Sequence, residues 1–290
     1  MHKSGFVNII GVPNVGKSTL CNLLVGERLS IITSKAQTTR HRIFGFLNSE
    51  NYQIIFSDTP GILKPSYKLH EKMMHFVSEA FLDADILLFI TDIFEDSRPE
   101  ENYLKKMQNA KVPLLLILNK IDLASDEKVN AKISEWKTML PNAEIFAVSA
   151  LKGINTDNIL PRITELLPEG PPYYEKDQLT DRPERFFISE IIREKILLNY
   201  KKEIPYSCEV IINSFKEEEK IIRIEATILV ERDTQKGILI GHKGAAIKKT
   251  GTEARLEAEK FFGKKIHLDL FVKVDKDWRN NDIKLSRFGY

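Results

Sequence analysis

The chain has 290 residues, of which 42% are hydrophobic and 29% charged, as in soluble globular proteins with apolar cores, and this length predicts about two domains. Residues 1–182 carry 21 Lys and Arg against 23 Asp and Glu, and residues 183–290 carry 22 against 18, a balance that permits a nucleic-acid partner for the second part. Two cysteines, Cys21 and Cys208, exclude a disulfide framework and favour a reducing cytosol. The start of the chain shows no signal peptide and no apolar run reaches the length of a membrane span, so we expect a cytoplasmic protein.

The first motif lies between a short apolar strand predicted at residues 6–10 and a helix predicted at residues 19–25. It fits the pattern G-x-x-x-x-G-K-[ST]. Its residues are Gly11, Val12, Pro13, Asn14, Val15, Gly16, Lys17 and Ser18, with Thr19 directly after it. A strand, a glycine-rich loop and a helix start together predict a phosphate cradle, in which Lys17 reaches the β- and γ-phosphates and Ser18 ligates Mg²⁺.

Strand and helix signals alternate through the first 167 residues. Strands are predicted at residues 52–57, 86–91, 114–118 and 145–148, and helices near 68–81, 100–109, 127–139 and 155–167. This alternation predicts a mainly parallel sheet with helices on both faces. The sequence PEGPPYY at residues 168–174 then marks a boundary, because its prolines can continue neither a helix nor a central strand. We therefore expect domains at 1–169 and 183–290, joined by a Pro-rich linker at 170–182.

Three further motifs follow predicted strands of the first domain. Asp58, Thr59, Pro60 and Gly61 form the first, in which the carboxylate can hold a Mg²⁺ water and the Gly61 N–H can sense a γ-phosphate.

Asn119, Lys120 and Asp122 form the next. The Asp122 carboxylate can accept both N1–H and the exocyclic amine of guanine, a donor pair that adenine lacks, while the Lys120 stem covers the base. Ser149, Ala150 and Leu151 form the last, in which the Ala150 N–H can donate to guanine O6.

These four motifs, each at a strand end, resemble the G1, G3, G4 and G5 boxes of the translation-factor-like GTPases. The resemblance implies a further threonine that ligates Mg²⁺, and we prefer Thr39 and keep Thr38 as the alternative. Ile62 stands where many small GTPases carry a water-orienting Gln, so slow intrinsic turnover is expected. Asn14 resembles the asparagine of relatives that recruit K⁺, although a role in loop packing is the alternative. The expected catalytic residues are Lys17, Thr39, Gly61 and Asn14, and the expected metal ligands are Ser18, Thr39 and Asp58.

The second domain has the predicted order α-β-β-α-α-β. A helix at residues 184–200 precedes strands at 208–215 and 221–231, and a short helix, a longer helix to residue 262 and a strand at 265–274 complete it. The turn GHKG between the later two helices has apolar flanks, which gives the arrangement of a type II KH domain, whose G-x-x-G loop clamps single-stranded nucleotides. The expected RNA-binding residues are Ile240, Gly241, His242, Lys243, Gly244, Ala245, Lys248 and Lys249.

A P-loop GTPase domain (α/β) followed by a smaller α+β type II KH domain resembles the bacterial Era GTPases over essentially the full chain. The matching stretches include GVPNVGKST, KAQTTRHRIFG, DTPGI, NKID, QKGILIGHKGAAIK and LSRFGY. The resemblance implies a GTP-hydrolysing factor that cycles between GTP and GDP and assembles the small (30S) ribosomal subunit, with the KH domain on the 3′ end of 16S rRNA. It also implies peripheral association with the inner membrane, and we expect a monomer.

Two rival classes are weighed against this interpretation. A P-loop kinase would need an acceptor pocket and would not need the Asn119–Asp122 motif or a switch threonine. A cell-cycle or division regulator would use GTP only to choose protein partners, and RNA binding by the purified protein would distinguish it.

Overall fold

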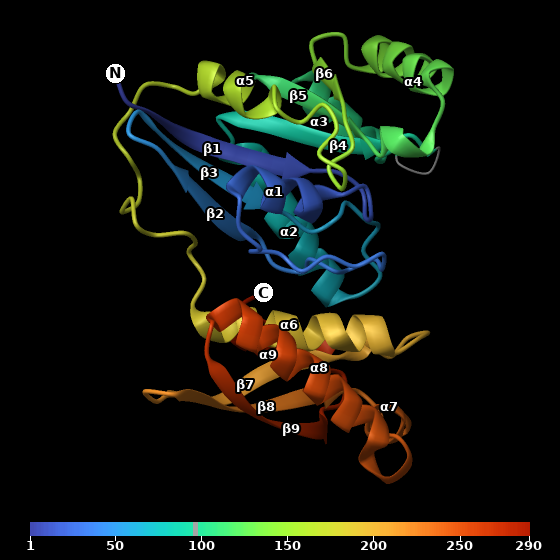
Figure 1. Ribbon diagram of the computed structural model, residues 1–290. Helices are drawn as coiled ribbons and strands as arrows, with labels where there is room; N and C mark the ends of the chain where they lie inside the picture. The colour runs from blue at the N-terminus through green and yellow to red at the C-terminus, as the bar shows by residue number, and fades with distance from the viewer. Residues whose placement is uncertain (95–97) are drawn as a thin grey trace. The chain divides into compact units, whose positions relative to one another are not determined.

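The computed structural model describes residues 1–94 and 98–290 (Figure 1). The chain forms two compact units: Met1–Ser66 with His70–Asp181, and Tyr67–Leu69 with Arg182–Tyr290. Within the described residues, no helix is both long enough and apolar enough to cross a bilayer.

The first unit is built on a six-stranded sheet. Its strands are β1 (Lys3–Ile10), β2 (Ile43–Asn48), β3 (Tyr52–Asp58), β4 (Ile86–Asp92), β5 (Leu114–Asn119) and β6 (Glu144–Ala147). The order is β2-β3-β1-β4-β5-β6, and all neighbours run parallel except β2 and β3, which are antiparallel. The predicted parallel sheet is therefore confirmed. The carboxyl ends of the parallel strands meet at one edge, where ligands bind in open α/β sheets.

The sequence analysis did not predict strand β2. Gly45 interrupts this short apolar segment and weakens its strand signal. The structure gives the reason for the glycine, because a Cβ at position 45 would lie 2.5 Å from Leu29 Cδ1 and 3.0 Å from Val25 Cγ2. The edge strand thus depends on close packing against the segment that ends α1.

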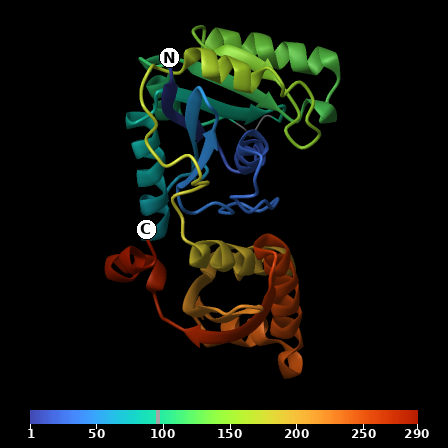
Figure 2. The same cartoon turned by 60° about the vertical axis from the view of Figure 1, so that its left-hand side comes forward.

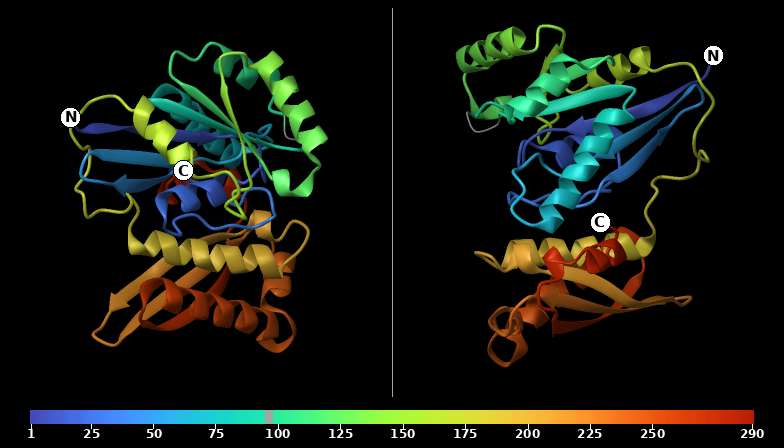
Figure 3. Two further views of the ribbon diagram at one scale, coloured as in Figure 1. Left: turned by 45° about the horizontal axis from the view of Figure 1, so that its top comes forward. Right: turned by 180° about the vertical axis from the view of Figure 1, so that it is seen from behind.

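In the described part of this unit, five helices cover both faces of the sheet. They are α1 (Lys17–Val25), α2 (Lys68–Leu82), α3 (Glu101–Gln108), α4 (Asp126–Met139) and α5 (Ile159–Leu166). The first and last lie on the face toward the viewer in Figure 1, and the other three lie nearer in the view from behind (Figure 3). Helices α2, α3 and α4 share one apolar core with strands β4 and β5, centred on Phe89 and Trp136, whose rings meet edge to face at 5.3 Å.

Residues 170–181, which lie within the linker predicted at 170–182, pack along the β2–β3 edge of the first unit, and we call them the strap. The buried Gln53 side chain donates to Tyr174 O at 2.8 Å and accepts from the Tyr173 and Tyr174 N–H groups at 2.7 and 2.9 Å. Tyr174 stacks on Phe46 at 4.1 Å, and Thr180 forms a β-bridge with Gly45. Prolines exclude a regular strand here, but these contacts hold the segment in place.

The second unit has a three-stranded sheet of order β7-β8-β9, formed by Glu209–Glu217, Ile221–Val230 and Lys265–Val274. The first pair is antiparallel and the second parallel. Helices α6 (Glu184–Asn199), α7 (Asp233–Ile240) and α8 (Ala245–Phe262) share one apolar core with the sheet. The predicted order α-β-β-α-α-β is confirmed.

A last helix, α9 (Asp282–Arg287), follows β9 at the end of the chain, and the sequence analysis did not predict it (Figure 2). Asn281 caps its first turn by accepting from the Lys284 N–H at 3.1 Å. Tyr290 donates to Glu209 at 2.8 Å, and Trp278 donates to Ser207 O at 3.1 Å. The helix has only six residues, and contacts distant in sequence hold the tail, so a local periodicity signal is weak.

Candidate functional site

The loop between β1 and α1 leads directly into the N-terminus of α1. Asn14 and Gly16 both have left-handed backbones, with φ of 66° and 102°, and Gly16 is the N-cap of α1. A Cβ at Gly16 would lie 2.2 Å from Asn119 Nδ2, so this position needs glycine for space as well as for conformation. The loop therefore presents a helix N-terminus, which favours a bound phosphate.

Three side chains expected to ligate Mg²⁺ meet beside this loop. Ser18 Oγ donates to Asp58 Oδ2 at 2.6 Å and lies 2.8 Å from Thr39 Oγ1. Thr39 Oγ1 also donates to Asp58 Oδ2 at 3.3 Å. They come from α1, the loop before β2 and the end of β3, so the fold brings together residues 40 positions apart.

The donor set fits a hard divalent cation, because two hydroxyls and a carboxylate are oxygen ligands of the kind that Mg²⁺ prefers. Asp58 Oδ1 is buried and has no hydrogen-bond partner among the described residues, which leaves it available to a ligand. Burial raises the pKa of the Asp58 carboxyl, against hydrogen bonds from Ser18 and the nearby charge of Lys17. A bound cation would reverse that shift by stabilising the carboxylate.

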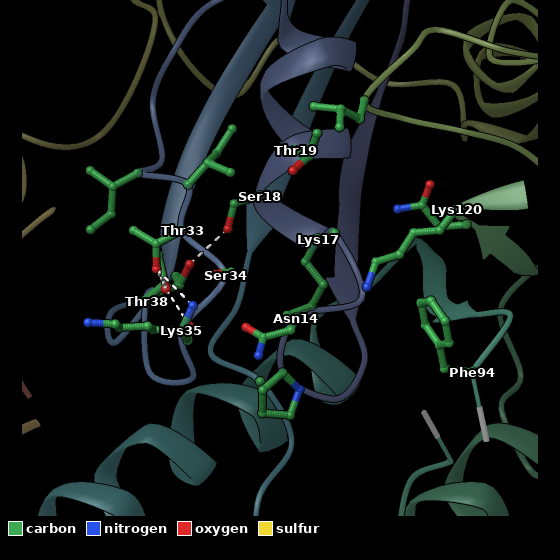
Figure 4. A pocket seen from close by; sticks show the side chains of 18 of the residues that line it. Asn14, Lys17, Ser18, Thr19, Thr33, Ser34, Lys35, Thr38, Phe94 and Lys120 are labelled. Atoms are coloured by element: carbon green, nitrogen blue, oxygen red, sulfur yellow. Dashed lines mark hydrogen bonds between the residues drawn. The ribbon is translucent and has the colours of Figure 1, made fainter. Parts of the chain in front are cut away.

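Thr38, the alternative metal ligand, faces a different set of partners. Its Oγ1 donates to Lys35 O at 2.6 Å and lies 2.6 Å from Thr33 Oγ1 (Figure 4). These bonds close a loop within residues 33–38, and Gln37 takes a left-handed backbone there, with φ of 56°. The geometry therefore favours Thr39 as the metal ligand and gives Thr38 a role in shaping the loop.

Lys17 lies buried inside the phosphate loop. Its Nζ donates to Val12 O at 2.9 Å. Burial lowers the pKa of Lys17 to about 8, against the opposing effect of Asp58. The ammonium is thus poorly solvated and close to the place where the loop would hold phosphates, so an anion there would stabilise its charge.

Asn119 joins the phosphate loop to the loop after β6. Its Nδ2 donates to Val15 O at 2.8 Å, and its Oδ1 accepts from the Ala150 N–H at 2.9 Å. The sequence analysis placed Asn119 in a base-binding motif without this bridging role, which depends on contacts across 104 and 31 positions. The Ala150 N–H already donates to Asn119 Oδ1. To donate to guanine O6 as expected, this N–H must either bond both acceptors at once or leave Asn119 for the base.

Asp122 lines the same cavity as Ser18 and Thr39. Hydrogen bonding from Ser149, and then the proximity of Lys152, lower the pKa of Asp122, and Lys152 Nζ lies 3.1 Å from its Oδ2. The group therefore stays ionised at neutral pH as an acceptor. Leu151, on the same loop, is 82% exposed and lines the cavity.

A single cavity of about 520 Å³ connects these groups (Figure 4). Its lining includes Pro13, Asn14, Gly16, Lys17, Ser18, Thr19, Thr39, Gly61, Asn119, Lys120, Asp122, Ser149 and Leu151 from the predicted site. Residues 31–35, together with Gln37, Thr38, Phe94 and Leu123, complete the lining and were not predicted to do so except for Thr38. The size lies within the range of small-molecule sites.

Contacts between the segment after β3 and the phosphate loop support the cavity. Thr59 Oγ1 donates to Ile9 O at 2.6 Å, and the Ile62 N–H donates to Gly11 O at 3.0 Å, so the segment after β3 is tied to the phosphate loop. A Cβ at Gly61 would lie 2.8 Å from Pro13. Ile62 is buried and apolar, and it offers no group that could orient water.

The second unit presents the predicted G-x-x-G turn between α7 and α8. Gly241, Lys243 and Gly244 all have positive φ, of 71°, 48° and 79°. A Cβ at Gly241 would lie 2.6 Å from Ala246 Cβ, so close approach of the two helices requires glycine. His242 and Lys243 are exposed at the tip, as are Ala245, Lys248 and Lys249 at the start of α8, while Ile240 is half-buried.

A groove of about 240 Å³ lies between α8, which begins directly after this turn, and the edge strand β9. It is lined by Ile247, Lys248, Gly251, Thr252, Arg255, Leu268 and Leu270. Only Lys248 had been predicted, because the groove forms between elements whose pairing the sequence does not reveal. An apolar floor with a basic rim suits unstacked bases and a phosphate backbone.

The fold and the two sites define a class of protein: a P-loop GTPase that carries a KH domain. Family models agree, because residues 6–120 match the model described as 50S ribosome-binding GTPase and residues 203–279 match the KH domain.

Comparison with known proteins identifies the family. The chain is 44% identical to GTPase Era of Staphylococcus epidermidis and 47% identical to that of Syntrophus aciditrophicus, covering 100% of this chain and 97% and 96% of those proteins. Two solved Era structures each match at a TM-score of 0.93 and 40% identity. One, covering 100% of this chain and 99% of its own, is a complex with MgGDPNP and nucleotides 1506–1542 of 16S ribosomal RNA. The other, covering 99% of both chains, is a variant of Aquifex aeolicus Era bound to GDP·AlF4⁻. The chain belongs to the Era family of GTPases.

Proposed function

We propose that this chain is a GTP-hydrolysing switch that binds single-stranded RNA near the 3′ end of 16S rRNA and acts in assembly of the small ribosomal subunit. The observation that carries the proposal is the meeting of Ser18, Thr39 and Asp58 at 2.6–3.3 Å beside the phosphate loop, in the same cavity as Asp122. A cavity that combines a cluster of Mg²⁺ ligands with a carboxylate able to read guanine fits a guanine nucleoside triphosphate.

Each part of the cavity has a role in this proposal. The loop N–H groups and Lys17 hold the β- and γ-phosphates, and Ser18, Thr39 and Asp58 hold Mg²⁺ directly or through water. When bound, Mg²⁺ neutralises charge between the β- and γ-phosphates. Thr39, as a ligand of Mg²⁺, and the Gly61 N–H would both lie beside the γ-phosphate, so we expect their loops to differ between the GTP and GDP states.

We also propose that Asn14 recruits K⁺ beside the phosphates. Its exposed side chain lines the cavity next to Lys17, and its left-handed backbone turns it there (Figure 4). A second cation would add positive charge at the transition state without a protein arginine. Replacing KCl by NaCl at equal ionic strength should slow turnover of the native protein and leave Asn14→Ala unaffected.

In the second unit, the proposed interface is the G-x-x-G turn with its adjoining groove. His242 and Lys243 lie beside the RNA backbone, and bases enter the groove over Gly251, whose hydrogen atom leaves room that a Cβ, 3.1 Å from Leu270, would fill. The solved Era complex with 16S ribosomal RNA supports this assignment. The domain limits 1–169 and 183–290 stay proposals, as does peripheral contact with the inner face of the membrane.

Nucleotide binding, phosphate release and RNA binding by the purified protein test the proposal. Purified protein should bind GDP and a GTP analogue in preference to adenine nucleotides, release phosphate from GTP, and bind an RNA with the sequence of the 3′ end of 16S rRNA in fluorescence anisotropy. His242→Asp with Lys243→Asp places two carboxylates where phosphates should pass, so RNA binding should weaken most at low salt while GTP binding persists. Undiminished RNA affinity in this variant would contradict the interface, and binding of nucleotide without any RNA would favour a regulator that acts through proteins.

A further inference from the structure

Asp92 is an acidic residue for which the sequence analysis found no role. It ends strand β4, and its backbone pairs in register with Asn119 at the end of β5. The side chain is 6% exposed. This register places a buried carboxylate one position away from Lys120, the residue expected to cover the base.

The Asp92 carboxylate contacts both Lys120 and Phe94. Its Oδ2 accepts from Lys120 Nζ at 2.7 Å, and its Oδ1 accepts from the Phe94 N–H at 3.0 Å. Lys120 Nζ also lies 5.4 Å from the centre of the Phe94 ring. Figure 4 shows the Lys120 and Phe94 side chains next to each other on one wall of the cavity.

The backbone of Lys120 is fixed as well. Its φ is 62°, a left-handed conformation that is uncommon for a residue other than glycine, and it precedes the short 3-10 helix Ile121–Leu123 that carries Asp122. A lysine side chain is flexible, but in Lys120 both ends are fixed: the Cα by the backbone conformation and the Nζ by Asp92. The four-carbon stem between them is therefore ordered along the cavity wall.

We propose that Asp92 is a positioning residue for base recognition: it holds Lys120 extended so that the lysine stem covers one face of the guanine base while Asp122 reads its edge. The proposal rests on the proposed guanine-nucleotide function. Without Asp92, binding of the nucleotide would have to order a mobile lysine, and that entropy cost would weaken binding and speed release.

The positioning role differs from the role of Asp122 in what it predicts. Lys120 touches a base face, which guanine and xanthine share, so loss of Asp92 should weaken both nucleotides alike. Loss of the Asp122 carboxylate should instead change the preference between them. A variant of Asp92 that altered the ratio of GDP to XDP affinity would therefore contradict the assignment.

Asp92→Asn is the matched substitution. The asparagine has the same shape and keeps an oxygen to accept from the Phe94 N–H, but it removes the charge that holds Lys120. Release of a fluorescent GDP derivative, followed by stopped flow, should be about tenfold faster, the effect expected when one charged hydrogen bond is lost. Asp157→Asn, at an exposed carboxylate of the same unit, controls for a lost charge and should leave release unchanged.

A double-mutant cycle separates positioning from a general effect on the fold. In a Lys120→Met background, Asp92→Asn should add nothing, because the side chain it positions is gone. If Asp92→Asn also speeds nucleotide release tenfold in the Lys120→Met background, the inference is wrong. It is also wrong if Lys120→Met alone speeds release but Asp92→Asn alone does not. Failure of the native protein to bind guanine nucleotides would instead overturn the proposed function. Asp92→Glu, which keeps the charge but displaces it, should also speed release and serves if the asparagine variant folds poorly.

Discussion

Nucleotide affinity should depend on pH between 7 and 8.5 because of Lys17, and few other side chains titrate in this range. Burial lowers its pKa to about 8 in the free protein, so roughly half of the molecules carry a neutral Lys17 at pH 8. Bound phosphates place negative charge beside the amine and raise its pKa again. Binding above pH 7 must therefore be accompanied by proton uptake, and affinity must fall as pH rises through 8.

The size of the effect follows from the same value. A group of pKa about 8 is roughly nine-tenths protonated at pH 7 and one-quarter protonated at pH 8.5, so GDP affinity should fall about fourfold between them. Proton uptake should approach about half a proton per complex at pH 8 and about one-tenth at pH 7. Titration calorimetry in buffers of different ionisation enthalpy measures this uptake directly.

Lys17→Met provides the control for every other titrating group, including the guanine ring. Measured at higher protein concentration, this variant should bind weakly and lose the uptake at pH 8. An affinity that stays level from pH 7 to 8.5 in the native protein would refute the reasoning. Uptake of the same size in Lys17→Met would assign the proton to a different group.

Three further predictions concern other parts of the molecule. Asp122→Asn should lower GTP affinity at least tenfold and move preference toward xanthine nucleotides, measured by competition, and unchanged GTP affinity would remove Asp122 from the base pocket. Basal turnover should lie below the roughly 1–100 s⁻¹ of kinases because Ile62 cannot orient water, and a fast rate in a phosphate-release assay would contradict this. Gln53→Leu would leave the Tyr173 and Tyr174 N–H groups without their hydrogen-bond acceptor. The free energy of unfolding of the first unit, measured by urea titration, should therefore fall by about 2–4 kcal/mol. The exposed Gln178→Leu is its matched control and should change little.

Local pattern was enough to predict most of the elements. Buried parallel strands such as residues 86–91 and 114–118 are continuous apolar runs, and the structure extends each by only one residue. Strand β2 and helix α9 were missed because one contains a glycine needed for packing against Val25 and Leu29, and the other has only six residues. In both cases the deciding contacts lie far away in the sequence.

The same limit applies to the sites. The motif residues could be predicted because glycine loops and strand-end carboxylates have a recognisable local chemistry. Thr39 was preferred over Thr38 from the sequence, but the geometric reason comes only from the fold, in which the Thr39 hydroxyl donates to Asp58 and the Thr38 hydroxyl donates to Lys35 O. The bridging role of Asn119 and the ion pair of Asp92 with Lys120 likewise join separate strands, which spacing alone does not reveal.

The strap has a practical consequence for dividing the chain. The edge of a sheet, with its unpaired N–H and C=O groups, can pair with another molecule. Here Leu179 O accepts the Phe46 N–H, and Thr180 donates to Phe44 O, so residues beyond the last helix of the first unit satisfy the open side of β2. A separately produced first unit that ended at Leu167 would expose this edge and tend to self-associate. One that ended at Asp181 would carry its own cover and stay dispersed.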